Sequence, residues 1–266
     1  MKKLINWKLY FILLGACAVA IALVLPYSFS LTSTDLTSLE IDLPAELLIV
    51  ITILQSVVLF AVVTFFGLLL SKKIGQENGG LRLPILEGIL NNEKKAKELK
   101  ALLLPSIGLG VLAGVLIIVL SIPFNNAIPE FKNMETVVPS FWKGFLASFY
   151  GGIAEEVLLR LFIMSLFVWI GFKIKKSKDG SPTSVGVWIA IILAAVIFGI
   201  GHLPATAQIA KLTGVVIARA IVLNGIGGII FGWLYWKKGL ESAIIAHFST
   251  DIVLHVITPL VLLAFA

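Results

Sequence analysis

The sequence predicts an all-α, polytopic integral membrane bundle of seven or eight transmembrane helices, and three observations support this fold class. The mean hydropathy is +1.03, and only 14% of the residues are charged, against about a quarter in soluble globular domains. Apolar runs of about 20 residues, the length that crosses a bilayer, recur along the chain. The polar segments between these runs are short, so no separate soluble domain is expected.

The charge pattern also indicates a membrane protein. The formal net charge is +6, and the lysines stand in short blocks beside the apolar runs. This is the distribution that fixes the cytoplasmic side of a membrane protein, so a nucleic-acid partner is not expected. The single cysteine, Cys17, lies within the first apolar run and excludes an intrachain disulfide.

The first two spans are predicted over residues 9–25 and 47–70. No small-x-small cleavage site precedes Pro26, so the first run is interpreted as a spanning helix rather than a signal peptide. Residues 27–46 contain four acidic residues and no lysine or arginine. This loop is expected outside the cell, so the N-terminus is expected in the cytoplasm. The chain is thus predicted to be a multi-pass protein of the cell membrane.

Residues 71–100 form the most basic loop of the chain and are expected to be cytoplasmic. The loop contains Lys72, Lys73, Arg82, Lys94, Lys95, Lys97 and Lys100. The stretch 81–99 mixes leucine and isoleucine with charges, as an amphipathic helix at the membrane surface would. A solvated, partly helical linker would explain the same pattern.

Five further spans are predicted along the rest of the chain. The third is expected to stop at Pro123, and the last either runs straight or bends at Pro259. The total is seven spans, or eight if the tail folds back. The predicted spans cover residues 102–122, 141–172, 185–202, 212–236 and 241–266.

Three charged residues in the fourth span predict a functional site. A charge near the centre of a bilayer costs about 2.5–3.5 kcal/mol, and Glu155, Glu156 and Arg160 lie within six positions. On an α-helix Glu156 shares a face with Arg160 and can pair with it. Glu155 lies about 100° away, so we expect it to face a wet cavity and take a proton from water. Packing between helices is the alternative.

Histidines on two later spans extend this pattern. His202 follows Gly199 and Gly201, which allow another helix to approach closely, although a histidine at the end of a span is weak evidence alone. His247 and Asp251 are four residues apart, and His255 continues the same stripe. An aspartate can orient a histidine or share a metal with it; a structural hydrogen bond between helices is the other interpretation.

The three patterns together resemble a known family. Glu155-Glu156-x-x-x-Arg160, Phe198-x-x-x-His202 and His247-x-x-x-Asp251, in this order on successive spans, are similar to the intramembrane proteases of the CAAX prenyl protease 2 or CPBP (CAAX protease and bacteriocin-processing, Abi) family. The resemblance implies an N-terminal region of transmembrane helices over 1–140, a catalytic membrane core over 141–258 and a helix end over 259–266. Prenylated CAAX proteins, bacteriocin leaders or other hydrophobic peptides are the implied substrates.

The resemblance also implies the roles of the site residues. Glu155 would activate water with His202, while His247 and Asp251 would bind the oxyanion or complete a metal site; Glu156, Arg160 and Phe198 would support them. Many relatives have Asn where this chain has Asp251. Because an ionised Asp only accepts hydrogen bonds, Asp251 is expected to orient His247 or to bind a metal.

Two mechanisms and one other function class stay open at the level of sequence. Glu155, His202 and His247 would hold a divalent metal such as zinc, or Glu155 would act as general base without metal. Alternatively, the chain is a transporter or a catalytically silent scaffold, since buried acids and histidines also mark ion pathways. His202 is predicted near the outer end of its span and His247 near the inner end. A shared site therefore requires the fifth helix to begin in the cytoplasm, to tilt, or to break at its glycines.

Overall fold

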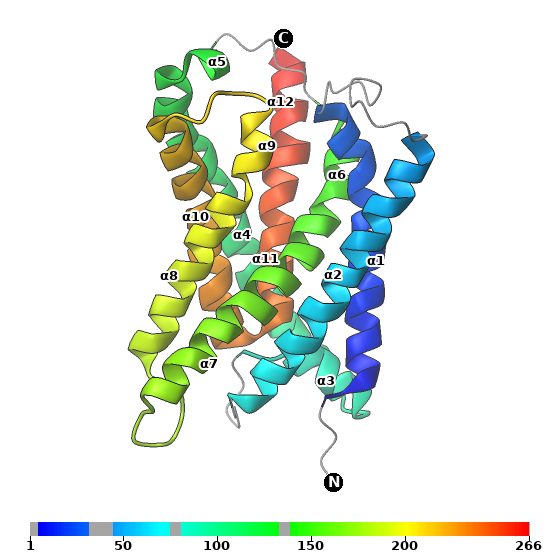
Figure 1. Cartoon of the computed structure of the whole chain (residues 1–266), viewed down its shortest axis with the longest axis vertical. Coiled ribbons are helices and arrows are strands. Elements are labelled where there is room, and N and C mark those ends of the chain that lie inside the picture. The colour runs from blue at the N-terminus through cyan, green and yellow to red at the C-terminus, as the bar shows by residue number, and fades with distance from the viewer. Residues whose placement is uncertain (1–4, 32–44, 75–80, 133–138, 266) are drawn as a thin grey trace.

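The computed structural model describes residues 5–31, 45–74, 81–132 and 139–265, so the acidic loop predicted outside lies largely beyond the described residues. The described residues form α-helices and three π-helical segments, labelled η (Figure 1). In chain order they are α1 (Trp7–Leu31), α2 (Ala45–Lys73), α3 (Pro84–Leu90), α4 (Ala96–Ala127), α5 (Pro129–Lys132), α6 (Phe141–Phe149), η2 (Tyr150–Glu155), η3 (Val157–Met164), α7 (Ser165–Ile174), α8 (Ser184–Gly201), α9 (Leu203–Ala207), α10 (Gly214–Lys238), α11 (Leu240–Ile252), η4 (Val253–Ile257) and α12 (Thr258–Phe265).

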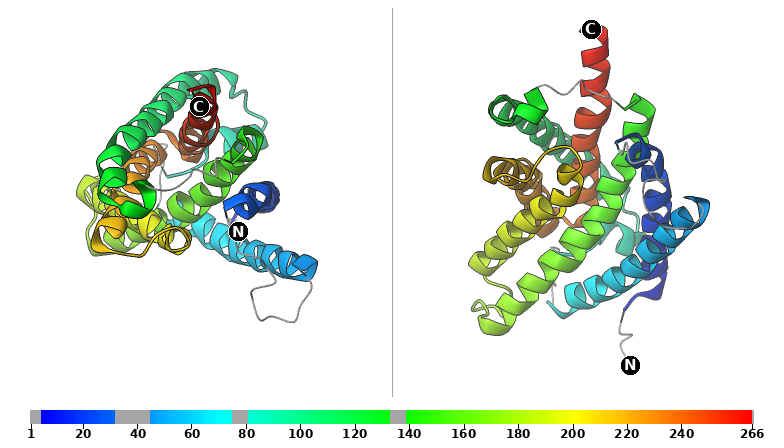
Figure 2. Two further views of the ribbon diagram at one scale, coloured as in Figure 1. Left: turned by 90° about the horizontal axis from the view of Figure 1, so that it is seen from above. Right: turned by 45° about the horizontal axis from the view of Figure 1, so that its top comes forward.

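Seven helical stretches of the described chain are long and apolar enough to cross a membrane, which confirms the predicted polytopic bundle. The tail does not fold back, because α11, η4 and α12 form one continuous span, Leu240–Phe265. Large apolar side chains on the outside of the bundle are exposed, as expected for lipid contact; Leu54 and Val58 of α2 are 59% and 65% exposed. The beginning of α2 leans away from the other helices (Figure 2).

Successive spans alternate in direction, so the lysine-rich segments gather at one end of the bundle. We call this the basic end: α1 begins there, α2 ends there, and the turn between α7 and α8 lies there (Figure 1). Asp179 stabilises that turn by accepting hydrogen bonds from Ser177 and Ser181, which lowers the pKa of its carboxyl group to about 2. The C-terminal helix α12 ends at the opposite end.

The prediction that the third span stops at Pro123 is wrong. Helix α4 continues through Pro105 and Pro123 to Ala127, and α1 likewise continues through Pro26. A proline removes one backbone hydrogen bond. In a lipid environment an irregular turn would leave several polar backbone groups without partners, which costs more than one missing bond.

Residues 81–99 are partly helical, with α3 over Pro84–Leu90 and the start of α4 from Ala96. The beginning of the stretch is packed against the bundle rather than fully solvated. Leu81 and Leu83 are buried, and the Arg82 carbonyl accepts from the Leu240 amide at 2.8 Å. Glu241 of α11 accepts from the first amides of α3, Ile85 at 3.0 Å and Leu86 at 2.9 Å. These long-range contacts fix the loop against the start of α11.

Helix α11 is enclosed by α4 on one side and by α6 and η2 on another, and glycines permit the close approach. A Cβ on Gly110 of α4 would lie 2.2 Å from the Ala246 carbonyl oxygen, and one on Gly144 of α6 would lie 2.0 Å from the His255 oxygen. The Thr250 hydroxyl donates to the Gly110 carbonyl at 2.8 Å. The helix that carries His247 and Asp251 is therefore held in a fixed position.

Candidate active site

The fourth span is not an ordinary α-helix where it carries its charges. It is wound as a π-helix over Tyr150–Glu155 and again over Val157–Met164, with Glu156 between the two segments. A π-helix bonds i to i+5 instead of i to i+4, and such segments are frequent at functional sites. The α-helical spacing assumed for Glu155 and Glu156 was therefore wrong, although Glu156 still reaches Arg160.

Glu156 and Arg160 form a completely buried ion pair. Both side chains are 0% exposed, and Arg160 Nε lies 3.3 Å from Glu156 Oε2. The guanidinium carbon lies 5.4 Å from the ring centre of Phe198 and 5.5 Å from that of Phe231. Within the described chain, none of its three nitrogens has a well-aligned hydrogen-bond partner. The arginine is thus stabilised by the charge of Glu156 and by two aromatic faces.

Glu156 also binds His247, a contact that the sequence did not predict. Its Oε1 lies 2.8 Å from His247 Nδ1, while the Phe231 ring stacks on the imidazole with 4.5 Å between ring centres. The carboxylate accepts the Nδ1 proton and so leaves Nε2 directed to the other side of the ring. Asp251, which was expected to orient His247, lies 3.7 Å from the other ring nitrogen, Nε2, so Glu156 makes the closer contact and the role of Asp251 stays a prediction.

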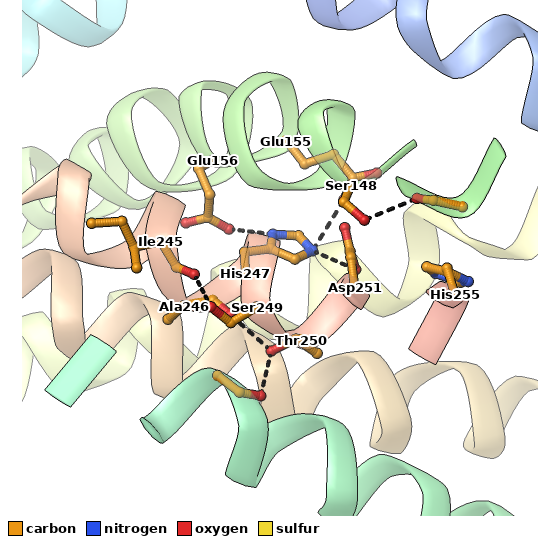
Figure 3. Close-up of polar contacts among 12 residues, drawn as sticks. Ser148, Glu155, Glu156, Ile245, Ala246, His247, Ser249, Thr250, Asp251 and His255 are labelled. Carbon is orange, nitrogen blue, oxygen red and sulfur yellow. Dashed lines mark hydrogen bonds and ion pairs between the residues drawn. The ribbon is translucent and has the colours of Figure 1, made fainter. Parts of the chain in front are cut away.

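Two carboxylates lie near the Nε2 atom of His247. Glu155 Oε2 and Asp251 Oδ1 are each 3.7 Å from it, beyond direct hydrogen-bonding distance. The Glu155 and Asp251 side chains are 21% and 12% exposed, whereas Glu156 is fully buried. Figure 3 shows Glu155 and Glu156 of the fourth span and Asp251 of α11 around His247. We refer to Glu155, Glu156, His247 and Asp251 as the carboxylate–histidine cluster.

Gly151 makes room for this cluster on the η2 side. A Cβ at this position would lie 2.1 Å from Asp251 Oδ2 and 3.1 Å from His247 Nε2. Any larger residue would therefore collide with the Asp251 carboxylate and crowd the His247 ring. Gly152, the next residue, also allows α11 to approach, since its Cβ would lie 3.0 Å from the Cβ of Phe248.

His202 lies beside the cluster without joining it. Its Nδ1 is 2.9 Å from the Phe198 carbonyl oxygen, and the Phe198 ring contacts both His202 and His247, at 4.8 Å and 5.6 Å between ring centres. In the described chain it forms no ion pair with Glu155 or Asp251. The aromatic ring of Phe198 thus connects the two histidines.

The depth at which His202 lies follows from the tilt of α8. The helix is continuous through Gly199 and ends at Gly201, and His202 lies in the turn before α9. Figures 1 and 2 show α7 and α8 running obliquely to the long axis of the bundle. A tilted helix advances less per residue along the membrane normal. The end of α8 reaches the cluster, because the Phe198 ring centre lies 5.6 Å from that of His247.

Other polar residues of the spans have separate partners. His255 Nδ1 lies 2.9 Å from the hydroxyl of Tyr27 in α1, and Arg219 donates to Asn125 of α4 at 3.1 Å. Asn224 donates to the Ala220 carbonyl within its own helix. These contacts join helices or satisfy a side chain, so they explain why such residues occur in apolar segments.

The donor geometry was compared with the predicted metal set of Glu155, His202 and His247. Among the described side chains, no group of three or more His, Cys, Asp or Glu residues is placed to hold an ion. His202, the third predicted ligand, is joined to His247 only through the Phe198 ring. The described side chains of Glu155, His202 and His247 are thus not gathered around one position, and a metal at this site stays a prediction.

The comparison with protein families matches the stretch that contains this site. Residues 137–253 match the family model described as type II CAAX prenyl endopeptidase Rce1-like. The chain contains an Rce1-like domain. The comparisons with curated proteins and with solved structures found no match.

The Rce1-like domain extends from the fourth span to the end of α11 and includes every residue of the carboxylate–histidine cluster, together with Arg160, Phe198 and His202. The matched stretch is thus similar to CAAX-type intramembrane endopeptidases, and the seven apolar helices of the described chain agree with a membrane-embedded protein. The resemblance inferred from three short patterns is thereby confirmed.

Proposed function

We propose that this protein is an intramembrane endopeptidase that hydrolyses a peptide bond in a membrane-anchored substrate, with Glu155 as general base. The observation that carries the proposal is the partly exposed Glu155 carboxylate 3.7 Å from His247 Nε2, next to a fully buried Glu156. Two adjacent glutamates in different environments suit two different roles. Glu155 meets water, and Glu156 holds the histidine.

The proposed reaction uses the side chains of Glu155, His247 and His202. A water molecule bridging Glu155 and His247 gives up a proton to Glu155, and its oxygen attacks the carbonyl carbon of the scissile bond. Protonated His247 donates its Nε2–H to the developing oxyanion. Glu155 then passes the proton to the leaving amine nitrogen as the C–N bond breaks. His202, through its Nε2, orients the water or the leaving group.

The proposed substrate class is a peptide whose hydrophobic anchor lies in the bilayer, such as a prenylated CAAX protein or a hydrophobic leader peptide. The cluster lies within spanning helices, so a soluble peptide would have to leave water to reach it. The proposed orientation places the basic end on the cytoplasmic side of the cell membrane, in agreement with the positive-inside rule. The N-terminus is then cytoplasmic.

Cleavage of a farnesylated CAAX peptide by the purified, reconstituted protein tests the proposal. Mass spectrometry should detect release of the C-terminal tripeptide by the native protein. Glu155→Gln and His202→Ala should each lower the rate by at least about 100-fold, the usual contribution of general acid–base catalysis. Glu98→Gln, at an exposed glutamate of α4, should retain the native rate.

Undiminished cleavage by Glu155→Gln would contradict the assignment, and Glu155-dependent ion flux without proteolysis would favour a transporter. Metal content and chelation should be measured on the same preparations. A metal-free preparation that stays active supports the glutamate mechanism. One zinc per chain, with activity lost on chelation, would replace it by a metal mechanism.

A further inference from the structure

A second polar site lies at the basic end of the bundle and shares no residue with the carboxylate–histidine cluster. It is a pocket of about 440 Å³ where the start of α1, the end of α2 and the end of α3 meet. Its polar lining comes from Asn6, Lys8, Lys72 and Asn91. Among the described residues that line it, none is acidic.

The lining provides hydrogen-bond donors of the kind that bind a phosphate group. The ammonium groups of Lys8 and Lys72 are point charges that donate hydrogen bonds, and the amides of Asn6 and Asn91 add NH₂ donors. Asn6 Oδ1 accepts from the Leu9 amide at 3.3 Å, and its NH₂ group adds donors rather than acceptors to the lining. A phosphate offers only oxygen acceptors near neutral pH and matches this set.

The surroundings of the pocket are those of a lipid surface. Trp7 lines the pocket and is 48% exposed, and Phe11, one turn further along α1, is 63% exposed. Tryptophan is enriched where the acyl chains of a bilayer meet its headgroups. A ligand whose phosphate lies between the lysines would thus have its apolar portion beside these exposed rings.

We propose that this pocket binds the phosphate headgroup of an anionic phospholipid, with Lys8 and Lys72 as the charged contacts. Basic pockets between transmembrane helices at the cytoplasmic side suit such headgroups. None of the lining residues belongs to the carboxylate–histidine cluster, so lipid binding and peptide hydrolysis are separate properties. A bound lipid would join the first two helices to α3, which is fixed to α11 through Glu241.

Native mass spectrometry of the full chain, extracted from nanodiscs of phosphatidylglycerol and phosphatidylcholine, tests this site. The native protein should retain phosphatidylglycerol in preference to phosphatidylcholine. Lys8→Gln and Lys72→Gln should each lower that retention roughly fivefold, and the double variant should abolish the preference. Lys73→Gln is the matched control, because Lys73 is an exposed lysine of the same helix end outside the pocket.

Two results would overturn the proposal. Equal retention by the Lys8→Gln/Lys72→Gln variant would show that the pocket is not the lipid site. Equal loss with Lys73→Gln would show a general effect of charge. A third arm separates a lipid from a free anion: inorganic phosphate in excess should not displace the retained lipid, and displacement would assign the pocket to soluble phosphate instead.

Discussion

Glu156 shows how one buried side chain can satisfy two partners of different kinds. One oxygen neutralises Arg160 and the other accepts from His247, so neither charge of the ion pair lies isolated in the apolar interior. An unpaired charge in such a position would shift the protein toward unfolding, whereas a matched pair is nearly neutral for stability. Glu156 therefore both fixes the position of the His247 ring and neutralises the charge of Arg160.

Removing only one charge of the Glu156–Arg160 pair should lower the free energy of unfolding more than removing both charges. Arg160→Met leaves Glu156 without its cation and should lower the free energy of unfolding by about 3–5 kcal/mol. The double variant Glu156→Gln/Arg160→Met, which removes both charges, should recover a measurable fraction of this loss. Unfolding of the purified protein in micelles with denaturing detergent measures both effects.

Additive losses in the double variant would show that the two side chains do not interact. The same variants separate stability from chemistry. The double variant should stay inactive even where its stability recovers, because a glutamine amide holds His247 without the charge that stabilises the protonated ring.

At the scale of elements, the close approach of η2 to α11 decides whether the cluster forms. Gly151 is the position at which this approach is tested most directly, since a Cβ would lie 2.1 Å from Asp251 Oδ2. Gly201, near the end of α8, has no atom within 4 Å of an added Cβ and provides a matched control.

Gly151→Ala should therefore slow peptide cleavage by up to about 100-fold, because small misplacements of catalytic groups have effects of this size. Gly201→Ala should leave the rate unchanged. The measurement is the same tripeptide-release assay, with helical content by circular dichroism as a check on folding. Equal rates for Gly151→Ala and the native protein would show that the site tolerates displacement of Asp251.

The sequence predicted the spans well and their local winding poorly, for a physical reason. Hydropathy is a local property, so the seven spans follow directly from composition. The π-helical turns around Glu156 and the docking of α3 depend on contacts with α11, which is distant in the chain. The Glu156–Arg160 pair was predictable from their spacing of four. The Glu156–His247 contact was not, because it joins two spans.

At the scale of the whole molecule, α1 begins and α12 ends at opposite ends of the bundle. The lysine blocks lie at the end where α1 begins, while α5 lies at the other end (Figure 1). Because the free cysteine Cys17 is buried, single introduced cysteines can report which end faces the outside.

In intact cells, a membrane-impermeant maleimide should label Glu130→Cys in α5 and should label Lys178→Cys only after the membrane is permeabilised. Both positions are exposed, so access depends on the side of the membrane. Replacement of Cys17 by Ala removes the background. The reverse pattern would show that the basic end faces outward and would contradict the proposed orientation.

The packing of α11 against α4 has a consequence for engineering this protein. The Thr250 hydroxyl binds the Gly110 carbonyl, Ser106 shares a 2.6 Å hydrogen bond with Ser242, and Tyr27 reaches His255. The C-terminal span thus packs on helices α1 and α4, which precede the stretch that matches the family. If the matching stretch were transferred alone to another membrane anchor, α11 would lose its packing and hydrogen bonds with α4. A transfer of this site therefore has to include α1 and α4 as well.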